Sequence, residues 1–189
     1  HIQDKDVFML KKRLKTHLNL EMSLNEEIVD VALKVKPYEV CLVPEKRQEL
    51  TTEGGLDVIK YKNSLARVFR KLSSKGIIVS IFIDPDREQI KEAAKIGAPF
   101  IELHTGRYAQ AKAKGSKKRE LKKLKDAARL AVSFGLRVNA GHGLDYNNVK
   151  EVAEIPEVEV LNIGFSIISK SIFTGLHTAV KDMRSLIGR

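Results

Sequence analysis

The segment Ile77–Ile83 (IIVSIFI), apolar at every position except Ser80, constrains the fold more than any other feature of the sequence. A strand with one face in water alternates apolar and polar residues, so an almost unbroken apolar run is typical of a parallel strand buried on both faces. The helical pattern of Leu56–Leu72 precedes this run, and a second helical pattern, ended by Gly97, follows it. A buried strand between two helices predicts an α/β protein.

The same alternation extends along the rest of the chain. Five further strands are predicted, at residues 17–22, 38–43, 100–104, 136–140 and 158–163. Helical patterns end near residues 14, 35, 72, 96, 134, 153 and 187, and the last is interrupted near Gly175. Residues 23–26 (SLNE) resemble a capping box at the start of one helix. This order predicts one domain with a parallel sheet and right-handed crossovers.

The composition excludes several classes of protein. The 189 residues are 43% hydrophobic and 31% charged, which provides for one good-sized core. No apolar run approaches the roughly 20 residues that span a bilayer, so no membrane association is expected. The single cysteine, Cys41, excludes a disulfide framework and favours the cytoplasm. Because it lies in an apolar strand pattern, we interpret it as a core residue.

The formal net charge of +10 favours anionic partners, which include phosphorylated small molecules, nucleic acid and anionic membranes. The most basic segment, Lys112–Lys125, leads into a helix with apolar residues at helical spacing. A solvated amphipathic helix explains this pattern. A basic nucleic-acid-binding module remains an alternative, although no aromatic residues interleave there to stack on bases.

Polar side chains gather where the predicted strands end. They are Glu21, Glu102, His104, Asn139 and His142, together with the turn at Gly164. In a (β/α)8 barrel this end of the strands carries the active site. A glutamate within an apolar strand is costly unless it is paired or functional. Two glutamates and a histidine therefore indicate either structural ion pairs or an acid–base set.

Two glycine motifs favour a phosphorylated substrate. His142 lies between two glycines in the segment Arg137–Leu144 (RVNAGHGL), where backbone N–H groups stay accessible to an anion. The turn at Gly164 opens a helix after the last strand, as in the phosphate sites of many barrels. A glycine-rich turn with an exposed histidine is the alternative for the first motif.

Other site types are disfavoured. The five histidines lack metal-binding spacing, so no metal is expected. The sequence has neither a GxGxxG nor a Walker A motif, which disfavours a nucleotide-binding sheet. Another phosphate-binding barrel enzyme, such as an epimerase or an aldolase-like enzyme, stays open. No predicted strand ends in the lysine that an aldolase would use for a Schiff base.

In five stretches the sequence resembles the pyridoxine 5′-phosphate synthase family of the deoxyxylulose-phosphate-dependent vitamin B6 pathway. The stretches are Asn19–Met22, Val43–Asp57, Gly97–Ala109, Val138–Leu144 and Leu161–Gly164. The resemblance implies a (β/α)8 TIM barrel with extra helices, which typically assembles as a homo-octamer. It also implies condensation of 3-amino-2-oxopropyl phosphate with 1-deoxy-D-xylulose 5-phosphate, giving pyridoxine 5′-phosphate, phosphate and water. No metal or organic cofactor is implied.

The resemblance also implies catalytic roles for three residues. Glu21 matches the glutamate that moves protons during Schiff-base formation and ring closure. His142 matches the proton donor. Glu102 matches a group that stabilises cationic or enol-like transition states.

The remaining roles that the resemblance implies concern substrate binding. Contacts to the aminoketone phosphate, largely through backbone N–H groups, fall on Gly143, Gly164 and Phe165. Contacts to deoxyxylulose phosphate fall on His1 and Thr51. The Pro44–Gly55 loop resembles a lid that excludes water from both substrates.

The sequence departs from the family in two respects. Phe165 stands where many members have histidine, so only a main-chain contact could be kept there. The family also begins with two further βα units, so residues 1–189 are expected to form a single, N-terminally incomplete barrel domain with about six of the eight units. Such a barrel would expose two strand edges, and we expect this chain alone to be unstable and inactive.

Overall fold

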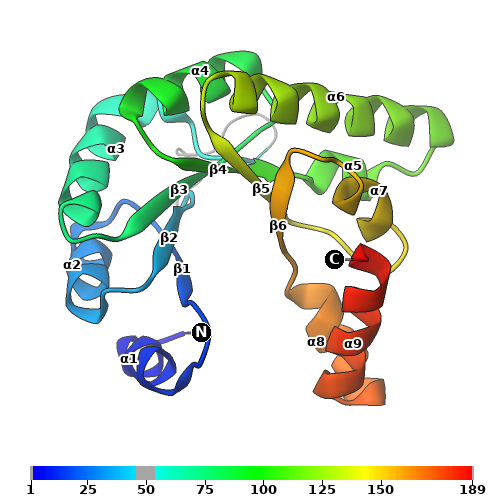
Figure 1. Ribbon diagram of the computed structural model, residues 1–189, viewed down its shortest axis with the longest axis horizontal. Coiled ribbons are helices and arrows are strands. Elements are labelled where there is room, and N and C mark those ends of the chain that lie inside the picture. Colours follow the sequence, from blue (N-terminus) through cyan, green and yellow to red (C-terminus); the bar gives the residue numbers. More distant parts are fainter. Residues whose placement is uncertain (1, 46–53, 189) are drawn as a thin grey trace.

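The sheet of this protein is built from parallel strands in sequence order. The computed structural model describes residues 2–45 and 54–188, which contain six strands in the order β1-β2-β3-β4-β5-β6. They are β1 (Asn19–Met22), β2 (Glu39–Leu42), β3 (Ile78–Ile83), β4 (Phe100–His104), β5 (Arg137–Gly141) and β6 (Val158–Asn162). The sheet curls, with helices along its outer side (Figure 1). This confirms the α/β prediction and corresponds to part of a TIM barrel.

The helices follow the predicted order, with differences at several ends. They are α1 (Asp4–Arg13), α2 (Glu26–Val35), α3 (Val58–Ser73), α4 (Arg87–Ile96), α5 (Gly106–Gln110), α6 (Lys114–Ser133), α7 (Val149–Ala153), α8 (Phe165–Thr174) and α9 (Leu176–Ile187). The predicted interruption near Gly175 is confirmed, because it separates α8 from α9. The short α5 was not predicted.

The capping-box prediction at residues 23–26 is wrong. The N-cap of α2 is Asn25, whose side chain accepts a hydrogen bond from the N–H of Glu27. The hydroxyl of Ser23 instead accepts from the N–H of Asn25 and donates to the Glu45 carboxylate. Asparagine and serine are both good N-caps, so the sequence pattern could not distinguish between them.

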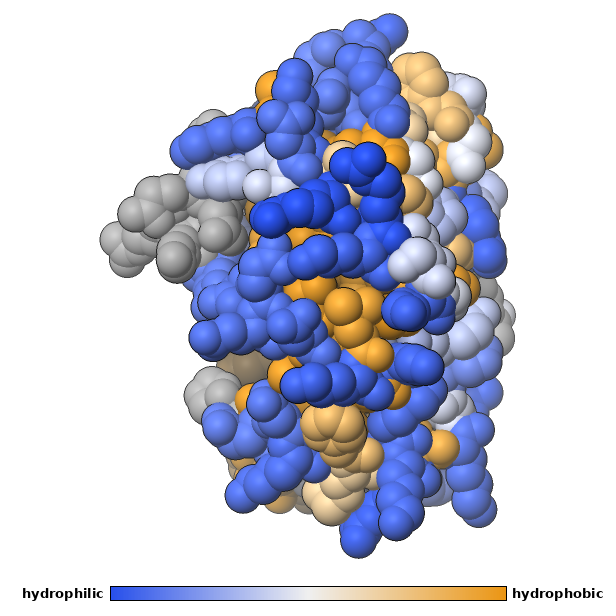
Figure 2. Space-filling view, turned by 90° about the vertical axis from the view of Figure 1, so that its left-hand side faces the viewer, coloured by the Kyte–Doolittle hydropathy of each residue, from blue (hydrophilic) through white to orange (hydrophobic). Residues whose placement is uncertain are grey.

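The core lies between the sheet and the surrounding helices. From β3, the alternate residues Val79, Ile81 and Ile83 are fully buried in this core, while Ser80 and Phe82 occupy the opposite face and are also buried. Burial on both faces is what the apolar run predicted. The outer surface over α2 and α3 is mainly hydrophilic, with apolar residues between the charged ones (Figure 2).

Helix α8 differs from the other long helices because none of its residues is buried. Its apolar side chains are largely in solvent, with Phe165 and Phe173 each 89% exposed and Ile172 78% exposed. This helix is nevertheless fixed at its start, since the Ser166 hydroxyl donates to the carbonyl of Leu144 at 2.9 Å. Its first turn is therefore anchored beside the carboxyl ends of the strands.

Candidate active site

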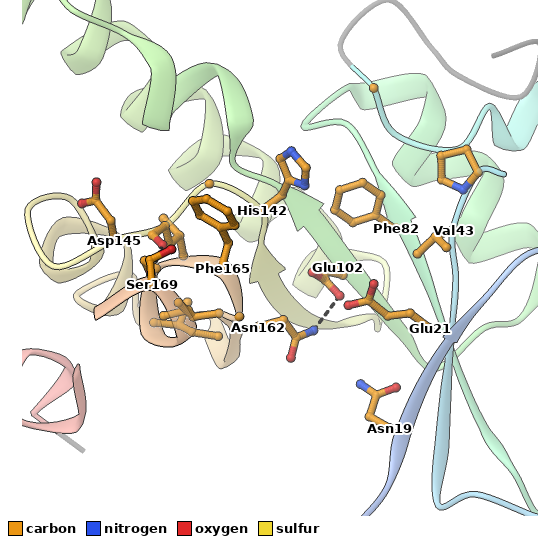
Figure 3. Close-up of a pocket in the computed structure, with 18 residues that line it drawn as sticks. Asn19, Glu21, Val43, Phe82, Glu102, His142, Asp145, Asn162, Phe165 and Ser169 are labelled. Carbon is orange, nitrogen blue, oxygen red and sulfur yellow. Dashed lines mark hydrogen bonds between the residues drawn. The ribbon is translucent and has the colours of Figure 1, made fainter. Parts of the chain in front are cut away.

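A pocket lies at the carboxyl ends of the strands. Its lining includes Glu21 from β1, Phe82 from β3, Glu102 from β4 and Asn162 from β6, and it extends to His142 and to the first turn of α8. In the close-up, the carboxyl groups of Glu21 and Glu102 point toward one another (Figure 3). The structure thus brings together residues that are far apart in the sequence, as expected for the active end of a barrel.

Glu102 is the buried carboxyl group of this pocket, with 3% of its surface exposed. Its Oε2 accepts a hydrogen bond of 2.6 Å from the Asn162 amide. The pKa of Glu102 is raised to about 7, chiefly by burial and also by the nearby Glu21 carboxylate, although the hydrogen bond from Asn162 lowers it. A carboxyl group poised near neutrality can both hold and release a proton at physiological pH.

A second hydrogen-bonded chain reaches Glu102 from the neighbouring strands. The Ser80 hydroxyl donates to the sulfur of Cys41 at 3.3 Å, and the Cys41 thiol lies 3.4 Å from Glu102 Oε2, to which it donates. Burial raises the pKa of Cys41 well above its usual value, so the thiol stays protonated and acts as a donor. Cys41 is buried, as expected, but it also contacts the site.

Gly141 contributes to the site through a contact with Glu102 that the sequence alone does not show. A side chain at this position would run into Glu102 Oε1 and would come within 3.0 Å of the Asn162 carbonyl oxygen. The absence of a Cβ at Gly141 therefore makes room for the Glu102 carboxyl group. Only the pairing of β4 with β5 and of β5 with β6 reveals this contact.

Ion pairing is the structural role that the sequence left open for Glu21 and Glu102. Within residues 2–45 and 54–188, neither Glu21 nor Glu102 lies within ion-pair distance of a lysine or arginine. Glu21 is exposed to the pocket, in contrast to Glu102. The structural ion pairs that the sequence left open are therefore absent from the described part, which favours the acid–base alternative.

His142 lies at the edge of the pocket with an unusual backbone conformation. Its φ is +80°, a left-handed conformation that is rare for a residue other than glycine. Partial burial of the ring lowers the pKa of His142, and the neighbouring His104 lowers it further. A histidine with a lowered pKa is a stronger acid when it is protonated.

The residues expected to bind phosphate also line the pocket. They are Gly143, Gly164 and Phe165, and the first turn of α8 is directed to the same space. The first N–H groups of a helix have no partner within the helix and attract anions. The side chain of Phe165 is exposed, so a contact through its main chain is the one that this position offers.

Not every residue of the predicted cluster reaches the pocket. Asn139 is buried lower in the sheet, where its amide lies 3.4 Å from the Glu39 carboxylate, and it does not line the pocket. His104 lies behind His142 rather than on the pocket wall. His1 and Thr51 fall outside the described residues, as does most of the Pro44–Gly55 loop, of which Pro44 and Gly54 line the pocket.

Among the residues that the structure describes, no group of three or more His, Cys, Asp or Glu side chains is arranged to hold a metal ion. Over the same residues, no helix combines the length and the apolar character needed to cross a membrane.

Comparison with protein families gives a match over residues 1–189 to the family described as "Pyridoxal phosphate biosynthesis protein PdxJ". A curated relative from Idiomarina loihiensis, called pyridoxine 5′-phosphate synthase, is 53% identical over 189 residues, which cover 100% of this chain and 78% of the relative. A relative of the same name from a Synechococcus species is 54% identical over 188 residues, which cover 100% of this chain and 79% of the relative.

Solved structures share the fold at low sequence identity. One described as "Native KDPGal structure" matches 98% of this chain and 78% of its own, with a TM-score of 0.66 and 13% identity. A xylose isomerase domain protein from Planctomyces limnophilus matches 89% of this chain and 72% of its own, with a TM-score of 0.53 and 15% identity. These similarities support the partial-barrel architecture only.

Proposed function

We propose a catalytic mechanism on the premise that this chain belongs to the PdxJ family of pyridoxal phosphate biosynthesis proteins, the pyridoxine 5′-phosphate synthases. The reaction assigned to the chain is condensation of 3-amino-2-oxopropyl phosphate with 1-deoxy-D-xylulose 5-phosphate. Its products are pyridoxine 5′-phosphate, inorganic phosphate and water. Schiff-base formation, loss of water and ring closure all require protons to be moved at defined atoms, which is the work of acid–base side chains.

The observation that carries this proposal is the pair of facing carboxyl groups. Glu21 is exposed to the pocket and Glu102 is buried, so two chemically identical groups have different environments. Different environments let two carboxyl groups take different roles in one reaction. Glu21 acts as the base that removes and returns protons. Glu102 stabilises the cationic Schiff base when ionised and an enol-like oxygen when protonated.

His142 is the proton donor of the mechanism. Its position at the pocket edge lets it reach a substrate that is held between the two carboxyl groups and the first turn of α8. The lowered pKa of His142 makes its protonated form a stronger acid, which suits donation to a departing hydroxyl group.

The phosphate of the aminoketone binds at Gly143, Gly164 and Phe165. Backbone N–H groups at the start of α8 and the positive end of its helix dipole favour an anion there. Because these contacts come from the main chain, phenylalanine at 165 can replace the histidine of many family members. The net charge of +10 attracts both phosphorylated substrates.

Some parts of the proposal rest on the resemblance alone. His1 and Thr51 are proposed to contact deoxyxylulose phosphate, and the Pro44–Gly55 loop is proposed to close over the substrates. A homo-oligomer, an octamer as in the family, and a cytoplasmic location are proposed on the same basis. The partners are phosphorylated small molecules rather than nucleic acid, and no cofactor is proposed.

The test is an assay of the purified chain with both phosphorylated substrates, in which pyridoxine 5′-phosphate is followed by its absorbance. A version extended at its N-terminus to the length of the curated relatives is assayed in parallel. The expected result is that the extended version forms product only when both substrates are present, whereas residues 1–189 alone form none. If both versions fold and neither forms product, the assignment of the reaction to this site is wrong.

A substitution on the basic helix α6 tests the alternative that this protein binds nucleic acid. Lys118 is exposed on α6, away from the residues of the pocket. Lys118→Glu should leave turnover unchanged, because the proposed site does not use this helix. A large loss of activity would place this helix in the functional site. Salt-dependent binding of RNA that this variant abolishes would favour the nucleic-acid alternative.

A further inference from the structure

We infer that Asp84 and His104 are positioning residues for His142. Asp84 fixes the ring of His104, and that ring packs against His142 and affects how readily His142 is protonated. The inference rests on the proposed function, in which His142 donates a proton. Neither Asp84 nor His104 lines the pocket, so neither is expected to touch the substrate. Asp84 and His104 would therefore affect catalysis through the position and charge of His142.

The first step is the contact between Asp84 and His104. Both side chains are buried, with 3% and 8% of their surfaces exposed. Oδ1 of Asp84 lies 3.1 Å from Nδ1 of His104 and also accepts the N–H of Gly55 at 3.0 Å. A carboxylate only accepts hydrogen bonds, so the proton of this contact is on Nδ1. Asp84 therefore fixes the orientation of the His104 ring, as carboxylates do for many functional histidines.

The second step is the packing of the two imidazole rings. The ring centroids of His104 and His142 are 4.9 Å apart with an interplanar angle of 64°, an edge-to-face arrangement. Phe82 closes the cluster, with its centroid 5.0 Å from that of His104 and 6.2 Å from that of His142. His104 and Phe82 thus support His142 from behind, while His142 itself is exposed to the pocket.

The backbone of His142 is held from the same strand end. Thr105, the residue after His104, donates its N–H to the carbonyl of Gly141 at 2.9 Å. Its hydroxyl lies 2.7 Å from that oxygen and 2.6 Å from the carbonyl oxygen of His142. These contacts stabilise the left-handed conformation of His142, which would otherwise cost free energy.

Space between the two rings is also restricted. A side chain at Gly106 would come within 3.0 Å of Cε1 of His104 and within 3.3 Å of Cδ2 of His142. Glycine at this position lets α5 begin directly against both rings. The rings of His104 and His142 therefore both pack against the start of α5.

The charges around His142 act in opposite directions. Carboxylates that share its pocket come from β1 (Glu21), β4 (Glu102) and the segment after β5 (Asp145), and they favour an imidazolium. His104, when protonated, repels it, and this repulsion contributes to the lowered pKa of His142. Removing His104 should therefore move the titration of His142 to higher pH.

The test measures the titration of His142 directly, by NMR of protein labelled at its histidines. The variants are His104→Gln, which removes the ring, and Asp84→Asn, which keeps an oxygen acceptor for both N–H groups but removes the charge. His177→Gln, an exposed residue of α9, is the matched control. Assignment of the His142 signal comes from His142→Ala.

The expected result is that His104→Gln shifts the His142 titration to higher pH, because it removes the group that repels the imidazolium, whereas His177→Gln leaves it in place. Asp84→Asn removes the charge that holds the His104 ring, and its effect is measured by kcat. In the assay, kcat should fall by about tenfold to a hundredfold, the order of loss caused by a small displacement of a catalytic group. KM should change by less than about twofold, because substrate binding is not affected.

The outcomes separate this inference from the proposed function. An unchanged His142 titration in folded His104→Gln protein, with kcat within about twofold of the parent, overturns the inference. If His104→Gln does not fold, Asp84→Asn decides by kcat, and a kcat within about twofold of the parent overturns the inference. If His142→Ala is fully active, the proposed role of His142 fails, while the NMR titration still reports whether the two rings are coupled.

Discussion

At the scale of single residues, the site depends on groups whose ordinary chemistry is changed by their surroundings. Glu21 and His142 are exposed to the pocket and are proposed to move protons, whereas Glu102 is buried behind them. Their side chains come from β1, from the loop after β5 and from β4.

In the full-length protein, Glu21→Gln and His142→Ala should each lower kcat by about two to four orders of magnitude, the usual contribution of an acid or base. Both variants should keep the unfolding midpoint of the parent to within a few degrees, because both side chains are exposed. Steady-state kinetics with both phosphorylated substrates measures the effect. A variant with near-normal kcat would remove its residue from the mechanism.

Glu102→Gln should stabilise the protein at pH 8 relative to the parent, and less so at pH 5. The pKa of Glu102 is about 7 in the folded protein and about 4.5 in the unfolded chain. The folded state therefore binds this proton more tightly, and stability falls as pH rises between these two values. The difference between the folded and unfolded pKa values of Glu102 corresponds to about 3 kcal/mol of stability.

Urea denaturation of Glu102→Gln and of the parent at pH 5 and pH 8 measures this difference. Glu154→Gln is the control, since Glu154 is exposed at the end of α7, and its effect on stability should not depend on pH. A Glu102→Gln effect that is equal at both pH values would show that the carboxyl group is ionised in the folded protein throughout this range.

Single residues were only partly predictable from the sequence. The glutamates and the histidine could be found because an ionisable residue inside or just after an apolar strand is conspicuous. The hydrogen bond from Asn162 to Glu102 could not be predicted, because it joins β4 and β6, which are not neighbours in the sheet. Cys41 looked like a core residue, since a strand pattern does not tell which neighbour a buried thiol contacts.

At the scale of elements, short-range patterns gave the order of helices and strands but not every end. The helical pattern that ends near residue 153 predicts a start near Asp145, but α7 begins at Val149. The reason is that Asp145 and Asn148 form a turn through their own side chains. Such turns compete with the first turn of a helix. Helix α5 has only five residues, too few for a periodic pattern to be recognised.

Asn25→Ala should destabilise the protein by about 1 kcal/mol, because it removes the side-chain acceptor for the N–H of Glu27 at the start of α2. Asn25→Asp keeps an acceptor and should retain the stability of the parent. Thermal or urea denaturation measures both. If Asn25→Ala were neutral and Ser23→Ala destabilising, the capping box predicted from the sequence would be correct after all.

At the scale of the whole molecule, the alternation of strands and helices was sufficient to predict a parallel sheet in sequence order. The curl of the sheet was predicted only through the family resemblance, which implied a barrel. The exposure of α8 could not be predicted, because it depends on how distant elements pack. An apolar helix with no buried residue leaves a hydrophobic surface, centred on Ile172 and Phe173. Exposed apolar surface of this kind is unusual and promotes association.

The double variant Ile172→Ser/Phe173→Ser should therefore bind less of a fluorescent hydrophobic dye than the parent chain. The loss of fluorescence should occur without a change in the circular dichroism spectrum, because neither side chain is part of the core. Lys118→Glu, on α6, controls for a general effect of surface substitution. Equal dye fluorescence in parent and variant would show that this face is covered in solution.

Gly141 determines how freely this site can diverge. The carboxyl group of Glu102 occupies the space in which any side chain at 141 would begin. In a library with all twenty residues at this position, selection for activity should return glycine alone, whereas position 165 should accept many types. Substitutions in the substrate pocket should therefore be tolerated at positions that contribute only their backbone, such as 165, and should not be tolerated at position 141 of β5.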